Sequence, residues 1–458
     1  MIGCFSLGRE TFDIEFAKKK LAKAKRIIKK LNNNLVFFDD LITNDQIGEK
    51  AIEYFANIKC TKFIVIQSTF TDAKFISSFV QKFKKPILFI SFQEKRTGER
   101  LRLNSLCGVN LGLHALIKNK FYSNFIIYKN DNESFSKEIL KFLKNNNYIT
   151  KNNYLKRVIN SKKRIKLITY KQPKIGLIGE RPVGFDTCDY NKEELKSKFN
   201  VKIKKINLQN LFKISSKVGI KNINNTKKNI SADLKNLNDL DQKELNKSLS
   251  LFHGLQQIQQ TQNINAFAVR CWPEMFTEYG CASCGPMAMM NETKISAACE
   301  ADVLGSLSCN ILNQLNNKPA LLVDIVDVDE KDNTTVFWHC GLAPISMAEK
   351  NTSSATVHSN RRKPLLHNFA FKSGEITIFR VSKSENKLKF ILMKGKVLKR
   401  KNSFSGTSGV IRLGQNTFKK IKNLFLSGLE HHVCFTYGDV IEDIKTLGKQ
   451  LKIPTYTI

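Results

Sequence analysis

The sequence predicts an α/β protein with two doubly wound α/β domains followed by a C-terminal antiparallel β domain. In residues 1–150 short apolar segments alternate with amphipathic ones, and a second alternation of this kind begins near residue 174. After residue 330, apolar and polar side chains alternate within short, turn-bounded segments. The first pattern predicts parallel sheets and the second predicts antiparallel strands. We therefore expect a flavodoxin-like domain at 1–150, a second α/β domain at 151–330 and a β-rich domain at 331–458.

The first domain combines apolar strands with amphipathic helices. No GxGxxG motif opens its first helix, so a dinucleotide-binding role has no support. The expected strands cover 1–7, 34–38, 63–67, 86–90 and 125–128, and the expected helices cover 12–31 and 46–57.

Polar side chains follow several of these strands, at the sheet edge where α/β folds bind ligands. Arg9 follows the first strand, Gln67 ends the third, and Arg100, Arg102 and Asn104 follow the fourth. These positions are candidates for substrate contacts. For Arg100 and Arg102 a solvated turn is an equally good interpretation.

The second domain follows a polar connection. Residues 145–173 are rich in Asn, Lys and Tyr and bury little, which is typical of a linker. Apolar segments at 174–179 and 201–207 predict strands, and the Lys- and Asn-rich stretch at 220–245 is either a helical excursion or a loose insertion.

A further strand is expected at 266–276, where it would bring Arg270, Trp272 and Glu274 to the same crevice. Trp272 could stack on the apolar face of a sugar, although a buried Trp more often belongs to the core.

The last domain is expected to be antiparallel. Its alternating segments lie at 336–344, 375–381, 387–398 and 408–414, and it ends with a strand and a helix at 429–453.

The composition indicates a globular chain rather than a nucleic-acid or membrane protein. The chain has 458 residues, 42% of them hydrophobic, and a net charge of +35. Its lysines are spread throughout, and those in 18–31 flank an apolar stripe typical of a solvated helix face. No segment has the roughly 18 apolar residues of a membrane span, and no signal segment is present. We expect a cytoplasmic protein.

Eleven cysteines, several of them within apolar runs, are expected to be reduced core residues. Cys281 and Cys284 have CxxC spacing, but no second pair accompanies them, so a structural role is favoured.

Two acidic residues lie in otherwise apolar sequence. Glu300 shares a helical stripe with Val303, Leu304 and Leu307. The apolar run at 320–323 predicts a buried strand, and Asp324 is expected at its end. Burying an ionised carboxylate costs several kcal/mol unless a cation or good donors meet it. The pair predicts a metal site. The alternative is that Glu300 pairs with a buried Arg and Asp324 caps a turn.

Adjacent histidines near the C-terminus, His431 and His432, are candidate metal ligands. Successive residues of a strand point to opposite faces, so only one of the two is expected to reach a given ion.

Several motifs, in this order, resemble those of the aldose-ketose isomerases of the L-fucose and L-arabinose isomerase group, and the resemblance covers roughly 170–458. The motifs are RCWPEMF at 270–276, ACEADVLGSL at 298–307, LLVDIVDVD at 321–329, WHCGLAP at 338–344, HHV at 431–433 and YGD at 437–439.

The resemblance implies a divalent metal, usually Mn²⁺, held by Glu300, Asp324 and His432. His431 is the fallback ligand, and His339 resembles an extra ligand of the arabinose branch. Glu300 and Asp324 would also move a proton between C1 and C2 of the sugar through an enediol. Known relatives are homo-oligomers, expected here as a trimer or hexamer, with active sites between subunits. Gly8–Thr11 or Gln67–Thr69 would then approach a neighbour's metal.

The substrate is expected to be a monosaccharide such as fucose or arabinose. Four arginines (Arg9, Arg100, Arg102 and Arg181) make an anionic sugar, such as a sulfonated hexose, a second possibility. Two other functions remain open, a metal-dependent sugar aldolase or lyase and a non-catalytic sugar-binding protein. The candidate substrate contacts are Arg9, Gln67, Arg102, Asn104, Arg270 and Trp272.

Overall fold

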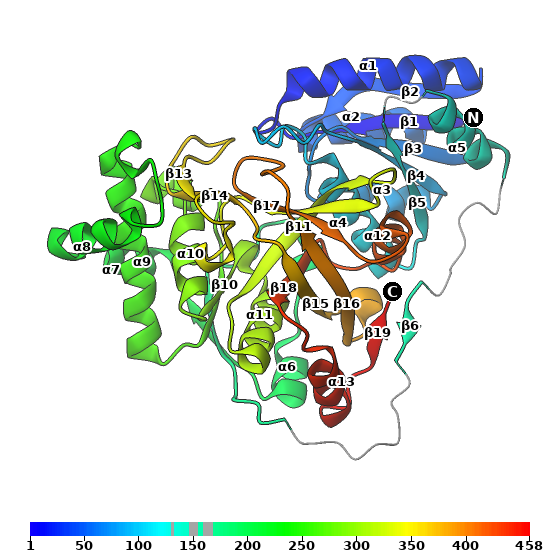
Figure 1. The fold of residues 1–458 in the computed structure, drawn as a ribbon. Coiled ribbons are helices and arrows are strands. Elements are labelled where there is room, and N and C mark those ends of the chain that lie inside the picture. The colour runs from blue at the N-terminus through cyan, green and yellow to red at the C-terminus, as the bar shows by residue number, and fades with distance from the viewer. Residues whose placement is uncertain (130–131, 146–153, 159–167) are drawn as a thin grey trace.

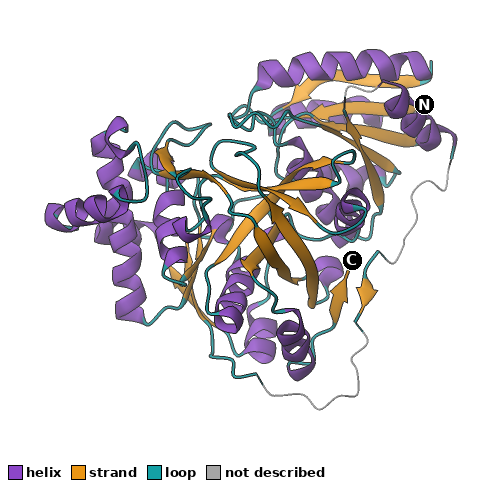
Figure 2. Ribbon diagram, in the orientation of Figure 1, coloured by secondary structure: helices purple, strands orange, loops and turns teal. Residues whose placement is uncertain are grey.

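The computed structural model describes residues 1–129, 132–145, 154–158 and 168–458. These residues form two parallel sheets and one large mixed sheet (Figure 1). Strands run through the middle of the molecule and helices lie mainly around them (Figure 2). The predicted α/β class with parallel sheets is confirmed. Most of the predicted linker at 145–173 lies outside the described residues.

The first sheet is parallel, with strand order β2-β1-β3-β4-β5, the order of flavodoxin-like folds. Helices α1 and α5 pack on one face, and α2, α3 and α4 pack on the other. The strands are β1 (Ile2–Leu7), β2 (Leu35–Ile42), β3 (Lys62–Gln67), β4 (Ile87–Phe92) and β5 (Ser123–Tyr128). The helices are α1 (Ile14–Leu31), α2 (Asp45–Ala56), α3 (Lys74–Phe83), α4 (Ser105–Lys118) and α5 (Asn132–Lys144).

Helix α1 has the predicted solvated basic face. It begins at Asp13, whose carboxylate accepts a hydrogen bond from the Phe16 amide and caps the helix. The buried residues of α1 recur every three or four positions and lie on one side, while most of its lysines are exposed. Those buried residues are Ala17, Leu21, Ala24 and Ile28.

The second sheet is also parallel, with order β10-β9-β7-β8. Its strands are β7 (Lys174–Ile178), β8 (Lys202–Ile206), β9 (Ala266–Val269) and β10 (Ser296–Ala298). The helices of this part are α6 (Lys192–Phe199), α7 (Leu208–Ser215), α8 (Ile220–Ser231), α9 (Gln242–Gln262), α10 (Cys284–Glu292) and α11 (Val303–Asn316).

Two expectations for this part are resolved. The stretch at 220–245 is a helical excursion, since it contains α8 and the start of α9. The expected strand at 266–276 is too long, because β9 ends at Val269. Pro273 has no amide hydrogen to donate to a neighbouring strand, and the chain turns there into a short helical segment, Met275–Tyr279.

The third sheet contains ten described strands in the order β13-β14-β17-β12-β11-β18-β15-β16-β19-β6. An additional pairing of β16 with β17 closes six of them, β17, β12, β11, β18, β15 and β16, into an antiparallel barrel. Helices α12 (Thr417–Leu426) and α13 (Ile441–Gln450) belong to this part. The strands are β6 (Lys156–Arg157), β11 (Ala320–Asp329), β12 (Thr334–His339), β13 (Ser354–Thr356), β14 (Leu366–Ala370), β15 (Gly374–Ser382), β16 (Lys389–Leu398), β17 (Thr407–Arg412), β18 (His432–Tyr437) and β19 (Thr455–Thr457).

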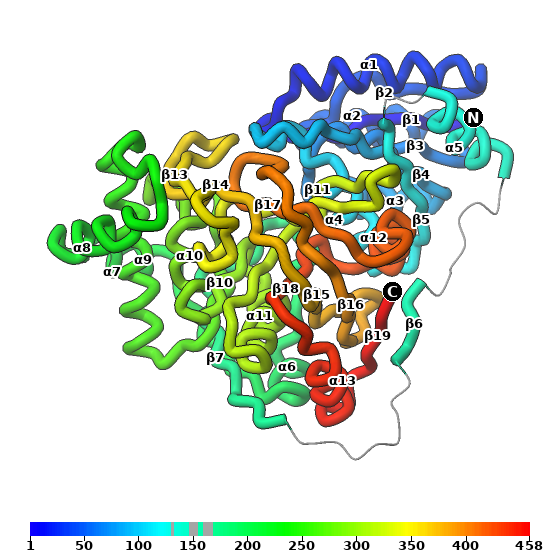
Figure 3. Tube along the Cα trace, viewed as in Figure 1, coloured from blue at the N-terminus to red at the C-terminus, as the bar shows by residue number. Residues whose placement is uncertain are grey.

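The third sheet differs from the predicted antiparallel domain in two ways. Strand β11, expected in the second domain, pairs with β12 and β18 of the barrel. The sheet is mixed, because β14 pairs with β17 and β16 pairs with β19 in parallel. At its edge β19 lies beside β6, so the C-terminal strand meets a segment from the middle of the chain (Figure 3). The boundaries at 150 and 330 remain predictions.

Among the described residues, every helix is too short or too polar to span a lipid bilayer.

Candidate active site and metal centre

A small pocket of about 80 Å³ collects side chains from all three parts of the fold. It contains most of the residues that the sequence analysis singled out, and its walls combine carboxylates, imidazoles, thiols and aromatic rings. The lining residues are Arg9, Thr11, Phe12, Phe70, Asn104, Cys271, Trp272, Phe276, Cys284, Cys299, Glu300, Asp324, Trp338, His339, Cys340, His358, Asn360, Arg361 and His432.

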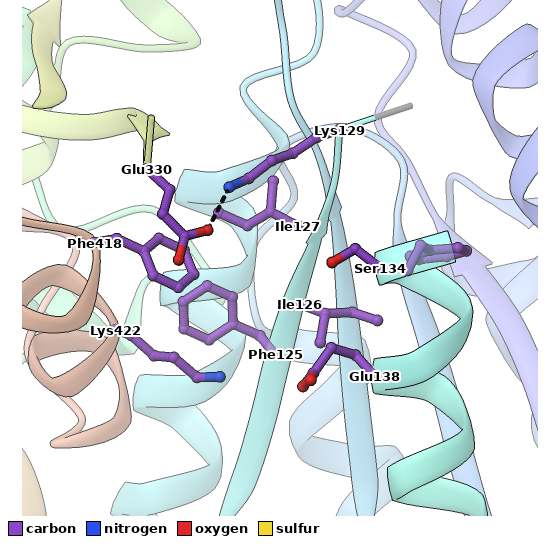
Figure 4. A pocket seen from close by; sticks show the side chains of 10 residues that line it. Phe125, Ile126, Ile127, Lys129, Ser134, Glu138, Glu330, Phe418 and Lys422 are labelled. Atoms are coloured by element: carbon purple, nitrogen blue, oxygen red, sulfur yellow. Dashed lines mark hydrogen bonds and ion pairs between the residues drawn. The ribbon is translucent and has the colours of Figure 1, made fainter. Parts of the chain in front are cut away.

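A second hollow, of about 260 Å³, lies between β5, α5 and α12 (Figure 4). No His or Cys is found among its ten described lining residues. Lys129 is 3.1 Å from Glu330 in an ion pair, and the rings of Phe125 and Phe418 form much of the wall. This hollow lacks the donor set of a transition-metal site, so the smaller pocket is the candidate active site.

Glu300 lies in a tight turn that precedes α11. The turn covers Cys299–Ala301, and Glu300 has a φ of 57°. The prediction that Glu300 sits on the helix is wrong. The Asp302 carboxylate accepts a hydrogen bond from the Gly305 amide and so starts α11 after Glu300.

The Glu300 carboxylate is buried and well supplied with donors. Trp272 Nε1 donates to Oε1 at 3.2 Å, and His431 Nε2 donates to Oε2 at 3.0 Å. Burial raises the pKa of Glu300, but the His431 hydrogen bond and the nearby imidazoles outweigh it, so the pKa lies below its ordinary value. The alternative that a buried Arg pairs with Glu300 is wrong.

Asp324 lies in the middle of β11, opposite His432 of β18. The prediction that it ends a strand is wrong, because the strand continues to Asp329 with Asp327 and Asp329 near its end. Asp324 is 8% exposed, and its Oδ1 has no hydrogen-bond partner among the described residues. Burial raises the pKa of this carboxyl. An unpartnered buried carboxylate oxygen is unfavourable unless a cation or a ligand meets it.

His432 lies between the two carboxylates. Its Nε2 is 3.5 Å from Asp324 Oδ1 and 3.8 Å from Glu300 Oε2. Its Nδ1 donates to Asp302 Oδ2 at 2.9 Å, because an ionised carboxylate can only accept. This hydrogen bond leaves the Nε2 lone pair directed toward Glu300 and Asp324.

Asp302 is held in turn by Arg380, which the sequence analysis did not identify. Two Arg380 nitrogens contact Asp302 at 2.7 and 2.9 Å, and both side chains are almost fully buried. Burial raises the pKa of Asp302, but Arg380 and the His432 hydrogen bond reverse this and keep the pKa well below its ordinary value. Asp302 is therefore a buried anion that orients His432.

His431 meets the same carboxylate from another side. Its Nε2 contacts Glu300, its Nδ1 lies 2.7 Å from Thr187 Oγ1, and its ring centroid is 3.8 Å from that of His432. Both histidines reach the site, because His431 precedes β18 and strand alternation does not apply to it. The expectation that only one of the two binds a given ion stays a prediction. Both His431 nitrogens are engaged, so it orients Glu300.

His339 ends β12, and its ring centroid is 6.1 Å from that of His432. Its Nδ1 has no hydrogen-bond partner among the described residues. Burial lowers its pKa to about 3, so the imidazole is neutral near pH 7. A neutral imidazole with a free nitrogen is a suitable further ligand.

These donors fit a divalent transition metal. Imidazole nitrogen together with carboxylate oxygen suits manganese, zinc or iron, and the unpartnered Asp324 Oδ1 is the atom that a cation would satisfy. Candidate ligand atoms of Cys188, Glu300, His431 and His432 also lie within 4.8 Å of one another. A thiol is a softer donor than the carboxylate oxygen and imidazole nitrogen that suit manganese, so Cys188 fits that ion less well. The set of Glu300, Asp324 and His432 stays a prediction.

Comparison with known proteins identifies the family. Residues 3–152 match the domain described as fucose/sulfoquinovose isomerase, N-terminal domain, and residues 366–458 match L-fucose isomerase, C-terminal domain. The sulfoquinovose isomerase of Priestia megaterium is 31% identical over 452 residues, which cover 98% of this chain and 97% of the relative. This chain belongs to the fucose isomerase family.

Other relatives agree. The sulfoquinovose isomerase of Alkalicoccus urumqiensis is 31% identical over 86% of each chain, and that of a Clostridium species (strain MSTE9) is 27% identical over 98% of this chain and 96% of its own. The resemblance found in the motifs is confirmed, and the chain is an enzyme, a sugar aldose-ketose isomerase.

In this fucose isomerase family member, three of the six predicted substrate residues line the pocket: Arg9, Asn104 and Trp272. Arg9 and Thr11 line the pocket of their own chain, although the resemblance had suggested that this loop approaches a neighbour's metal.

The other three predicted substrate residues of this isomerase are engaged elsewhere. Gln67 donates to the Thr69 carbonyl and the Thr71 hydroxyl, and Arg102 pairs with Asp13 at 2.9 Å. Arg270 pairs with Glu274 at 2.6 Å. None of the three is among the described residues that line the pocket. These residues do follow strand ends, as predicted, but their donor groups bind neighbouring acceptors and not the pocket.

Proposed function

We propose that this chain is a divalent-metal-dependent isomerase that converts a sulfonated hexose, sulfoquinovose, to its ketose. The observation that carries the proposal is the buried grouping of His432 Nε2 with Glu300 Oε2 and Asp324 Oδ1, at 3.8 and 3.5 Å. The substrate is suggested by the relatives that are named sulfoquinovose isomerase and align with nearly the whole chain.

The proposed ion is Mn²⁺, held by Glu300, Asp324 and His432, with His339 as an additional ligand. When bound, such a cation polarises the sugar oxygens O1 and O2, which stabilises negative charge as it develops there. Asp302 and Arg380 fix the His432 ring in the orientation that this role needs.

The two carboxylates also carry the proton transfer. Aldose-ketose isomerisation removes a proton from C2 and returns one to C1 through an enediol, so a base and an acid must face neighbouring carbons. Glu300 and Asp324 are the acidic residues among the described residues that line the pocket, and a positioned acid or base typically contributes about 10²- to 10⁴-fold. Trp272 and His431 hold the Glu300 carboxylate in place from two sides.

A homo-oligomer, expected as a trimer or hexamer, remains part of the proposal. Sedimentation or light scattering at micromolar concentration tests it separately from activity.

The function is tested with a substrate panel of sulfoquinovose, fucose and both arabinoses, using enzyme stripped with a chelator and then reloaded with Mn²⁺. We expect metal-dependent conversion of sulfoquinovose to its ketose. In deuterated water, NMR should show exchange of one C–H without carbon–carbon cleavage. Fragmented products would indicate an aldolase or lyase, and binding without turnover would indicate a sugar-binding protein.

Glu300→Gln is the matching variant. It should lose isomerase turnover while its circular dichroism spectrum stays like that of the wild type. Unchanged turnover would remove Glu300 from the catalytic role.

A further inference from the structure

The arginines that could bind an anionic sugar differ in whether a carboxylate already neutralises them. Arg9 lines the pocket, but it is 2.5 Å from Asp72. Arg102 and Arg181 are paired with Asp13 and Asp186. Their charges are compensated within the protein, so they are poor candidates for an added anion.

Arg361 is different. It lines the pocket and is partly buried, and it forms no side-chain ion pair or hydrogen bond with any described residue. Its guanidinium carbon lies 5.0 Å from the ring centroid of Phe276 and 5.5 Å from that of Trp272. The aromatic faces position the guanidinium but leave its N–H donors available.

The turn that presents Arg361 is well supported. The amides of Arg361 and Arg362 donate to the His358 carbonyl, and the Asn360 amide donates to His358 Nδ1. The His358 ring packs edge-on against Phe276, with centroids 5.1 Å apart.

A second arginine braces this turn. Arg100 Nε donates to Asn360 Oδ1 at 2.9 Å, and Arg100 also donates to the Thr11 carbonyl. The turn is therefore fixed to the loop that carries Arg9. This arrangement adds positive charge at the same end of the pocket.

Trp272 connects this end to the catalytic end. Its Nε1 donates to Glu300, while the same indole lies beside Arg361. The indole of Trp272 thus lies beside the unpaired guanidinium and also donates to the Glu300 carboxylate, so both groups border the same pocket. A sugar with its reacting carbons near Glu300 would bring its far end to Arg361.

We infer that Arg361 binds the anionic group of the substrate and so determines the preference for a sulfonated over a neutral hexose. This inference rests on the proposed function. A sulfonate presents three acceptor oxygens, which the planar guanidinium can bind through two parallel N–H donors. Because the sulfonate is remote from the reacting carbons, the contact is equal in ground state and transition state, and it acts mainly on KM.

The test compares Arg361→Gln with Arg362→Gln, a matched control that removes the same charge from the next, exposed residue of the same turn. Both Mn²⁺-loaded variants are assayed on sulfoquinovose and on 6-deoxyglucose, its neutral counterpart. For Arg361→Gln we expect kcat/KM on sulfoquinovose to fall roughly 100-fold, mainly through KM, with little change on 6-deoxyglucose. Arg361→Lys should recover part of the loss, and Arg362→Gln should match the wild type.

A second measurement needs no neutral substrate. Methanesulfonate should inhibit sulfoquinovose turnover competitively in the wild type and in Arg362→Gln, and this inhibition should be lost in Arg361→Gln.

The outcomes separate the two ideas. In two outcomes the wild type turns over sulfoquinovose while Arg361→Gln either loses kcat/KM equally on both sugars or keeps its inhibition by methanesulfonate. Either result would overturn the role of Arg361 and leave the proposed function intact. A wild type that isomerises only neutral sugars would overturn both.

Discussion

His432 Nδ1 lies 2.9 Å from Asp302 Oδ2, and both side chains are almost fully buried. Asp302 is not among the described residues that line the pocket, so its effect on the site passes through the imidazole. Asp302→Asn keeps the size of the side chain and removes its charge. We expect the affinity for Mn²⁺ to fall about 10- to 100-fold, as for other residues that orient a metal-binding histidine. Titration calorimetry with Mn²⁺ alone measures this directly.

The control for this variant is Asp327→Asn, a buried carboxylate of the same strand as Asp324 that pairs with Arg96 rather than with His432. Its Mn²⁺ affinity should match the wild type. Equal affinities of Asp302→Asn and wild type would show that Asp302 does not orient His432 for metal binding.

The two adjacent histidines are predicted to have different roles. His432 directs Nε2 toward both carboxylates, whereas His431 has Thr187 and Glu300 on its two nitrogens. His432→Gln should lose Mn²⁺ binding to a greater extent than Asp302→Asn. His431→Gln should keep most of the Mn²⁺ affinity and lose turnover, because Glu300 loses a donor. The reverse pattern in calorimetry would make His431 the ligand.

Much of the fold could be predicted because it depends on local pattern. The strands of the first sheet are apolar runs followed by amphipathic helices, and their bounds differ from the prediction by only a few residues. The carboxylates of Glu300 and Asp324 were also found from sequence, since charged residues in apolar surroundings need a partner.

The remaining features depend on contacts between distant residues. Glu300 has the spacing of a helical residue, but the cap at Asp302 excludes it from α11, and no periodicity reveals that. Arg380 lies 78 residues from Asp302 in the sequence and looks like an ordinary strand residue. The pairing of β11 with β18, which brings Asp324 opposite His432, likewise joins segments that are far apart in the chain.

Oxidation of Cys271 and Cys299 tests whether the wall of the pocket beside Glu300 must stay mobile for turnover. Their sulfur atoms are 2.8 Å apart, both residues line the pocket, and Cys299 is next to Glu300. Diamide, a thiol oxidant, should remove two protons and two electrons from this pair, form a disulfide and become a hydrazine. Because the new bond constrains the Glu300 turn, turnover should fall and should recover with dithiothreitol.

Cys271→Ser should resist this inactivation, whereas Cys284→Ser, which changes another thiol of the same pocket, should respond like the wild type. Peptide mass spectrometry identifies the disulfide. Equal sensitivity of Cys271→Ser and wild type would assign the effect to other cysteines.

Arg380→Met tests the buried ion pair as a structural element. Removing one partner of a buried pair leaves the other charge uncompensated, which typically costs about 3–5 kcal/mol in unfolding free energy. Arg412→Met is the control, because Arg412 is 43% exposed and lies 3.8 Å from Asp332, and exposed pairs contribute at most about 1 kcal/mol. Urea unfolding followed by circular dichroism compares them. If Arg380→Met loses no more unfolding free energy than Arg412→Met, the buried ion pair with Asp302 is not a major stabilising element.

Asp13 predicts a local pH dependence at the start of α1. Burial raises the pKa of this carboxyl, but the hydrogen bond from the Phe16 amide and the Arg102 guanidinium together outweigh this effect. The pKa of Asp13 in the folded protein therefore lies below the ordinary value. An acid whose pKa is depressed by folding stabilises the fold above its unfolded pKa of about 4, and this contribution is lost as the pH falls. Hydrogen exchange of the first turn of α1 should therefore accelerate, relative to its intrinsic rate, on acidification from pH 6 to pH 3.

Asp13→Asn keeps a side-chain acceptor for the cap but has no charge to lose, so the protection of the first turn against exchange should vary less with pH than in the wild type. Asp40→Asn, which changes an exposed carboxylate outside α1, should behave like the wild type, and an Asp13→Asn profile identical to wild type would remove Asp13 as the source of the pH dependence.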